Sequence, residues 1–214
     1  MRMQLDRRRI CCHEAGHSVA YMVSGDRVLL VVADRNVSLT EHQEELKNRA
    51  RANSSRSGPG YTIAQKTERM CERAGCSGEI TTDPYNSLMI RLRLDADCES
   101  CMELLTNHIA CIYAGGVATD LLEPGGSAIN RATAMMFETQ DDLAEIERIV
   151  SGSIQNEQQR SALKDRALAR STEWISGESA ALLAMRSALV ESGVLDGTVA
   201  ERIIRTALSS TRNL

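Results

Sequence analysis

Aromatic residues are scarce in this chain of 214 residues, which has one Phe, one Trp and four Tyr. A hydrophobic core must therefore be filled mainly by Leu, Ile, Val, Ala and Met. The chain is nevertheless long enough to bury a sizeable core, and its length fits one domain, or one domain with a helical extension.

Long hydrophobic runs are also missing. No apolar stretch approaches the roughly 20 residues that span a bilayer, and the N-terminal residues lack the apolar region of a secretory signal. The net charge is −4 with both signs interspersed, which gives no support for nucleic-acid binding. We therefore expect a soluble, cytoplasmic protein with neither a nucleic-acid nor a membrane partner.

The seven cysteines are an odd number, and without a secretory signal we interpret them as reduced thiols. The pairs Cys71-x4-Cys76 and Cys98-x2-Cys101 are an alternative, because together they could form a second, structural zinc site. More than twenty residues separate the two pairs, and no knuckle pattern accompanies them. The sequence thus favours free thiols over this second site.

The feature that points to a function is His13-Glu14-Ala15-Gly16-His17. Two histidines four residues apart lie on one face of a helix, one turn from each other, and can share one Zn²⁺. Glu14 then lies beside the metal, where its carboxylate can take the proton of an attacking water. This is the H-E-x-x-H arrangement of zinc peptidases.

The surroundings of the motif favour a helix. Residues 9–24 have helical periodicity, and Gly25 ends the pattern. Gly16 inside this helix costs roughly 1 kcal/mol relative to Ala, so we expect another backbone or helix to approach closely there. The alternative is an accidental motif, with two ordinary histidines and a solvated glutamate.

The rest of the chain predicts a small sheet followed by helices. Strands are expected at 27–33, at 60–64 and at 87–94, where apolar and basic residues alternate. Polar residues 36–59 are interpreted as an insertion with a helical piece at 41–52. From residue 95 onward the pattern is helical, with segments at about 95–122, 139–150, 156–176, 178–192 and 196–209. The predicted fold class is α+β and predominantly helical, with a small β-sheet beside the H-E-x-x-H helix and a C-terminal helical bundle.

Four segments, taken in order, resemble the zinc peptidase domain of FtsH-type AAA+ proteases. They are H-E-A-G-H at 13–17, G-Y-T at 60–62, the run I-A-C-I-Y-A-G-G-V-A-T-D at 109–120, and Asp142-Leu143. The resemblance implies a zinc-dependent metalloendopeptidase core over residues 1–155, with the insertion at 36–59. Residues 156–214 would then be a helical extension packed on that core.

Several residues depart from the family pattern. Val117 replaces the family's Arg after the double glycine, and Asp120 replaces its Glu. No G-x-x-x-x-G-K-[ST] phosphate loop occurs in the 214 residues. We therefore expect a stand-alone peptidase that hydrolyses flexible or unfolded polypeptides without ATP. The family assembles as rings, so the resemblance also implies a homo-oligomer.

A catalytic zinc needs a third protein ligand besides His13 and His17. The resemblance implies Asp142, at a helix start where a carboxylate is also favoured by the helix dipole. Asp120, Asp141 and Glu138 remain alternatives, and Asp142 could be an ordinary first-turn acid. If Asp120 is not a ligand, it could be the acceptor that orients the other ring nitrogen of a histidine.

The expected reaction is hydrolysis of a peptide bond, with Zn²⁺ polarising the carbonyl and Glu14 transferring the proton. By analogy with other zinc peptidases, the substrate would extend along an edge strand near Tyr61. Two alternatives remain: an inactive peptidase-like module that acts in binding or regulation, and a purely helical interaction protein.

Overall fold

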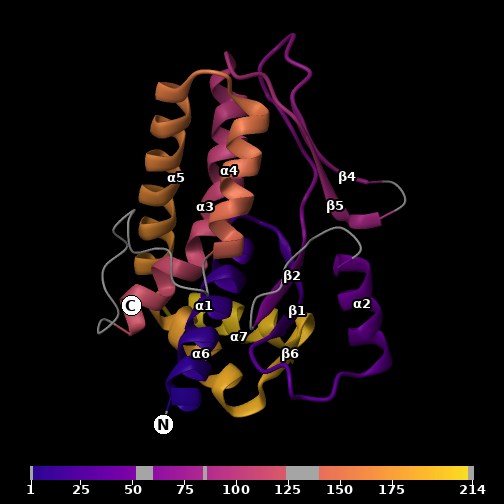
Figure 1. The fold of residues 1–214 in the computed structure, drawn as a ribbon, viewed down its shortest axis with the longest axis vertical. Coiled ribbons are helices and arrows are strands. Elements are labelled where there is room, and N and C mark those ends of the chain that lie inside the picture. Colours follow the sequence, from indigo (N-terminus) through magenta and orange to yellow (C-terminus); the bar gives the residue numbers. More distant parts are fainter. Residues whose placement is uncertain (1, 52–59, 84–85, 124–139, 212–214) are drawn as a thin grey trace.

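The computed structural model describes residues 2–51, 60–83, 86–123 and 140–211. Within these ranges the chain is predominantly helical and carries two small antiparallel sheets, as Figure 1 shows. The predicted α+β class is therefore confirmed. The helices are α1 (Arg2–Val23), α2 (Glu41–Arg51), α3 (Glu99–Leu122), α4 (Gln140–Ser153), α5 (Glu157–Gly177), α6 (Ser179–Ser192) and α7 (Gly197–Thr211).

The first sheet has the strand order β2-β1-β6, and the second has the order β3-β4-β5. The strands are β1 (Arg27–Val32), β2 (Tyr61–Gln65), β3 (Arg69–Met70), β4 (Glu79–Asp83), β5 (Asn86–Arg93) and β6 (Val194–Asp196). β1 is antiparallel to both of its neighbours and β2 lies at an edge. β1 is mostly buried, as its run of β-branched and Leu side chains predicts.

Helices α3, α4 and α5 lie side by side in the upper half of Figure 1, and α1, α6 and α7 lie below them. One core cluster joins residues of α1, β1, α3, α5, α6 and α7, and a second fills the space between α3, α4 and α5. Aliphatic side chains, Ala, Cys and Met dominate both clusters, as the scarcity of aromatic residues predicts. Because residues on both sides of position 155 share these cores, the C-terminal helices pack directly on the rest of the chain.

Local sequence signals explain several helix ends. Asn156 caps α5, since its side chain accepts a hydrogen bond from the Gln159 amide at 3.0 Å. Thr40 and Gln43 form reciprocal side-chain to backbone hydrogen bonds at the start of α2. Gly25 and Gly193 end α1 and α6 with positive φ angles of 81° and 74°, which favour glycine.

Three details differ from the sequence-based expectations. α1 begins at Arg2 rather than at residue 9. Strands β3 and β4 lie in the weakly patterned part of the chain, and with β5 they form a separate second sheet. β6 interrupts the helical C-terminal region; its three residues are too few to show a period of two, and pairing with β1 determines their conformation.

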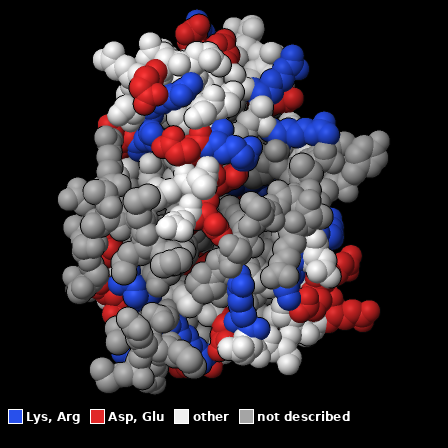
Figure 2. Space-filling model, in the orientation of Figure 1, with Lys and Arg blue, Asp and Glu red and all other residues white. Residues whose placement is uncertain are grey.

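Acidic and basic side chains lie close together over the face shown in Figure 2. Ion pairs also join neighbouring helices: Lys164 of α5 contacts Glu147 of α4 at 2.6 Å, and Arg170 of α5 contacts Glu103 of α3. Exposed pairs of this kind contribute roughly 0–1 kcal/mol each. Among the described residues, no helix has the length and apolar character needed to cross a membrane.

Gly16 lies where α1 meets α3. A Cβ atom at this position would overlap the carbonyl oxygen of Ala114 and the Cβ of Ala118. The close approach expected from the sequence is thereby confirmed, and α3 is the element that makes it.

We predict that Gly16→Ala lowers the free energy of unfolding by about 1–3 kcal/mol, because the added methyl group overpacks this contact. Helix propensity alone would give the opposite sign, since Ala is favoured over Gly by about 1 kcal/mol. Gly152→Ala in α4 is the matched control, because its Cβ would meet no atom within 4 Å. Urea denaturation measures the free energy of unfolding of both variants. A Gly16→Ala variant as stable as Gly152→Ala would contradict the prediction.

Candidate metal centre

Three side chains from two helices converge on one point. His13 and His17 lie one turn apart on α1, and Asp142 lies in the first turn of α4. The two Nε2 atoms are 3.0 Å apart, and Asp142 Oδ2 lies 3.0 Å from His13 Nε2 and 3.1 Å from His17 Nε2. All three residues are buried, with 5%, 5% and 8% of their surface exposed.

The tautomer of His17 follows from its other ring nitrogen. Nδ1 lies 2.9 Å from the carbonyl oxygen of Cys111 in α3. Because a carbonyl oxygen only accepts, Nδ1 carries the proton, and a neutral His17 directs the lone pair of Nε2 at Asp142 Oδ2. Two acceptors face each other at 3.1 Å, so the arrangement requires a cation between them, either a proton or a metal ion.

The donor set fits Zn²⁺. Two imidazole nitrogens and one carboxylate oxygen leave a fourth position open, as catalytic zinc sites do. The spacings of 3.0–3.1 Å are close to the roughly 3.3 Å between tetrahedral ligands at zinc–ligand distances near 2 Å. These three residues thus form a group that could hold a metal ion.

Gly115 of α3 provides the space for the two imidazoles. A Cβ atom there would lie 2.6 Å from His17 Nε2 and 2.6–2.7 Å from the His13 ring. Any side chain at this position would thus occupy the place where the ring nitrogens converge. Gly115 is not among the sequence-predicted site residues, although a Gly-Gly pair inside a predicted helix signals a close approach.

Glu14 is buried beside the histidines. Its Oε2 accepts a hydrogen bond of 2.8 Å from the hydroxyl group of Thr62 in β2, and Gly60 leaves room for Oε1. Burial raises the pKa of the Glu14 carboxyl group, and the neighbouring His13 and His17 offset part of the rise. A carboxylate with a raised pKa is a stronger base than one in water, as proton transfer at neutral pH requires. Thr62 was not among the sequence-predicted site residues.

Asp142 and His17 stabilise each other's charged forms. Burial opposes ionisation of Asp142, yet the adjacent His17 and His13 hold the pKa of this carboxyl group well below its usual range. Burial also disfavours the charged form of His17, but the charge and hydrogen bond of Asp142 outweigh it and raise the pKa of the ring. The site therefore favours positive charge at the point where the three ligand atoms meet.

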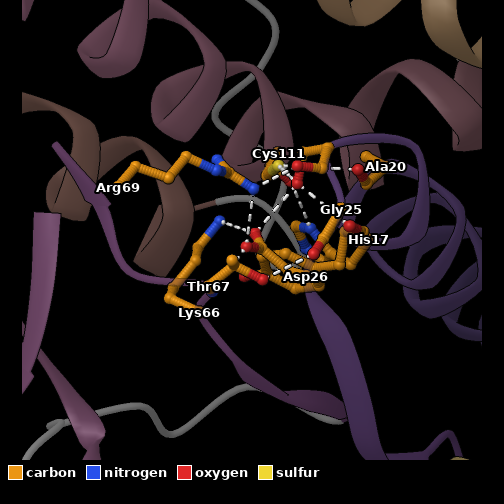
Figure 3. A network of polar contacts seen from close by, with 10 residues as sticks. His17, Ala20, Gly25, Asp26, Lys66, Thr67, Arg69 and Cys111 are labelled. Atoms are coloured by element: carbon orange, nitrogen blue, oxygen red, sulfur yellow. Dashed lines mark hydrogen bonds and ion pairs between the residues drawn. The ribbon is translucent and has the colours of Figure 1, made fainter. Parts of the chain in front are cut away.

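A buried ion network adjoins this centre (Figure 3). Asp26, directly before β1, accepts hydrogen bonds from Lys66 Nζ at 2.6 Å and from Arg69 at 2.9 Å. The backbone amide of Thr67 donates to the same carboxylate at 2.9 Å. The Asp26 side chain is completely buried, and its two cationic partners are therefore needed to offset the cost of removing it from water.

Cys111 connects the network to His17. Its carbonyl oxygen accepts from His17 Nδ1, and its thiol lies 3.4 Å from the hydroxyl oxygen of Ser24. Ser24 in turn donates to Asp26 at 2.8 Å. The orientation of one candidate ligand thus depends on contacts that run from α3 through the end of α1 to the segment after β2.

The structure separates the candidates for the third ligand. Asp142 lies with the histidines, whereas Asp120 and Asp141 are not part of that group, and Glu138 lies outside the described residues. The partner of His17 Nδ1 is the Cys111 carbonyl group, so Asp120 does not orient this ring. Among the described residues no hydrogen-bond partner reaches His13 Nδ1. Tyr61 lies on the edge strand β2, next to Thr62.

We predict that Asp142→Ala loses the zinc of this centre, because two histidines alone leave too few ligands. Asp120→Ala is the matched control and should retain the zinc, because Asp120 lies outside the group of His13, His17 and Asp142. Elemental analysis after dialysis measures the zinc bound per chain in both variants. The variant His13→Ala/His17→Ala serves as the reference, because it gives the zinc content of a chain that lacks this centre. Zinc retained in Asp142→Ala but lost in Asp120→Ala would reverse the assignments.

Comparison of the chain with protein-family models finds no match, and comparison with curated protein sequences finds none either. The resemblance of the four sequence segments to FtsH-type peptidases therefore remains a prediction, and the geometry of the centre is what carries a functional proposal.

Proposed function

We propose that the chain is a zinc-dependent metalloendopeptidase that hydrolyses flexible or unfolded polypeptides. The observation that carries the proposal is the convergence of His13 Nε2, His17 Nε2 and Asp142 Oδ2 within 3.1 Å of one another, with the buried carboxylate of Glu14 beside them. Bound at these atoms, Zn²⁺ would polarise the substrate carbonyl group and acidify the attacking water.

The residues of the chain have separate roles in this proposal. His13, His17 and Asp142 hold the metal ion, and the Cys111 carbonyl group orients one of the rings. Glu14 takes a proton from the attacking water and passes it to the nitrogen of the leaving amine. Thr62 holds the Glu14 carboxylate through its hydroxyl group, so that the carboxylate does not have to reorganise during the reaction.

The edge strand β2 supports a mode of substrate binding. It carries Thr62, which contacts Glu14, and it pairs with β1 on one side only in the three-stranded sheet. An extended polypeptide could add to the other side through main-chain hydrogen bonds, which recognise backbone rather than sequence. Tyr61 alternates with Thr62 along this strand and so faces away from α1.

We predict that Glu14→Gln lowers proteolysis by about 10²–10⁴-fold, the usual contribution of a general base, while zinc content is unchanged. Gln is nearly isosteric with Glu but cannot accept the proton. The measurement is cleavage of casein, with and without a zinc chelator. Glu145→Gln on α4, an acid paired with Arg148 at the surface, is the control and should retain wild-type cleavage. Undiminished cleavage by Glu14→Gln would show that the assigned role is wrong.

We further predict that the purified chain spares well-folded proteins. A folded domain is stable by about 5–15 kcal/mol, so its backbone is rarely extended enough to pair with an edge strand. The 214 residues contain no phosphate loop, so ATP should not change the rate. The test uses a stable and a destabilised variant of one substrate, each with and without ATP. Equal cleavage of the two variants, or stimulation by ATP, would contradict this prediction; zinc binding without any cleavage would favour a binding module.

A further inference from the structure

Four cysteine side chains meet at the upper end of α3, away from the His13 centre. Cys71 follows β3, Cys76 lies in the connection between β3 and β4, and Cys98 and Cys101 lie at the start of α3. The sulfur atoms of Cys71 and Cys98 are 3.4 Å apart, as are those of Cys76 and Cys101. All four sulfurs lie within 4.8 Å of one another.

The sheet side of this sulfur cluster is built by a tight turn. Gly75, directly before Cys76, has a φ of +83°, which side chains other than glycine rarely adopt. The turn is closed by hydrogen bonds from the Cys71 amide to the Gly78 carbonyl at 2.7 Å and from the Cys76 amide to the Arg73 carbonyl at 3.0 Å. The backbone thus returns on itself and brings Cys71 and Cys76 to the same side.

Gly78 is the second special position. A Cβ atom there would overlap the sulfur of Cys101 and lie 3.3 Å from the sulfur of Cys76. Its amide also donates to Cys76 Sγ at 3.4 Å, a contact that stabilises negative charge on sulfur. Glycine at this position therefore lets the backbone approach the sulfurs, as metal-binding turns require.

The helix side is equally well suited to thiolates. Cys98 is the N-cap residue of α3, and Cys101 is three positions further, on the same face of the first turn. Both are buried, with 1% and 0% of their surface exposed. The unpaired amides at a helix N-terminus favour negative charge, so a thiolate is stabilised at the N-cap residue Cys98.

The spacing of the four sulfurs fits one ion. Zinc–sulfur distances near 2.3 Å place tetrahedral sulfur ligands roughly 3.8 Å apart, within the range of the cluster. A disulfide needs about 2.05 Å between its sulfurs, and the cysteines of the cluster are free in the structure. Two separate disulfides would bring the sulfurs together only in pairs, whereas all four lie within 4.8 Å of one another here.

We propose that Cys71, Cys76, Cys98 and Cys101 bind a structural Zn²⁺ ion that fastens the β3–β4 turn to the start of α3. Four thiolates close the coordination sphere, so the ion has no open position for a substrate. The three remaining cysteines of the chain, Cys11, Cys12 and Cys111, are buried elsewhere. This site does not depend on the proposed peptidase activity.

The test counts zinc in the full chain, in the Glu14→Gln background so that self-cleavage does not interfere. We expect two zinc ions per chain in this background. Cys98→Ala/Cys101→Ala should lose one, and His13→Ala/His17→Ala should lose the other. The matched control is Cys11→Ala/Cys12→Ala, which also removes two buried thiols and should retain both ions.

The results separate this proposal from the proposed function. Loss of zinc in the histidine variant alone, with none lost in the cysteine variant, would overturn the cysteine site and leave the His13 centre intact. Iron in place of zinc would overturn the identity of the metal, since four thiolates also bind iron. Disulfides between these cysteines, detected by mass spectrometry of the alkylated, unreduced chain, would overturn the proposed cysteine site.

A second measurement needs no substitution in the cluster and so avoids variants that fail to fold. The chain with Cys71, Cys76, Cys98 and Cys101 intact is stripped of metal under reducing conditions and refilled with Co²⁺. We expect intense thiolate-to-cobalt charge-transfer absorption, which the His13, His17 and Asp142 centre cannot give because it has no sulfur ligand. Absence of this absorption in a folded, cobalt-loaded chain would overturn the proposal.

Discussion

The close approach of α1 and α3 is the contact on which the candidate centre depends. Gly16 allows the backbone of α1 to lie against the Ala114 carbonyl group, and Gly115, the next residue of α3, leaves the space in which the two imidazoles meet. A wider separation would remove the contact between His17 Nδ1 and the Cys111 carbonyl group, which fixes the tautomer of the ring. One helix contact therefore determines both the position and the tautomer of a candidate metal ligand.

Burial makes the centre electrostatically demanding. Two carboxylates and two imidazoles are removed from water at the junction of α1, α4 and β2, where unpaired charge is costly. The low pKa of Asp142 and the raised pKa of His17 show how the pair reduces this cost, because the negative carboxylate and the positively charged ring stabilise each other. Burial raises the pKa of Glu14, and the neighbouring His13 and His17 offset only part of this rise. Two acids in one site thus acquire different proton affinities, as separate roles in ligation and proton transfer require.

The sequence predicts the local part of this arrangement and not the part that depends on distant contacts. The spacing of His13 and His17 predicts their shared face because helical geometry is periodic, and the intrahelical Gly16 predicts a close neighbour. The resemblance implies Asp142 as the third ligand but leaves other carboxylates as alternatives, and the structure places Asp142 beside the histidines. Thr62 and the Cys111 carbonyl group were missed, because a hydroxyl group on a strand and a main-chain oxygen carry no pattern of their own. The separation of the two cysteine pairs in the sequence favours free thiols over a sulfur cluster. In the structure the hairpin of β4 and β5 spans this separation by antiparallel pairing and brings the two pairs together.

The strand β3 connects the two candidate metal sites along the chain. Cys101 and Gly115 are separated by about 21 Å along α3 at 1.5 Å per residue, so neither site contacts the other directly. Arg69 of β3 reaches Asp26 in the network that adjoins His17, and Cys71, two residues further, lies in the sulfur cluster. Holding Cys71 against the start of α3 thus fixes the strand from which Arg69 extends. A structural ion at the cysteines would act on the His13 centre through this strand, by restraining the network that orients His17 rather than by taking part in the chemistry.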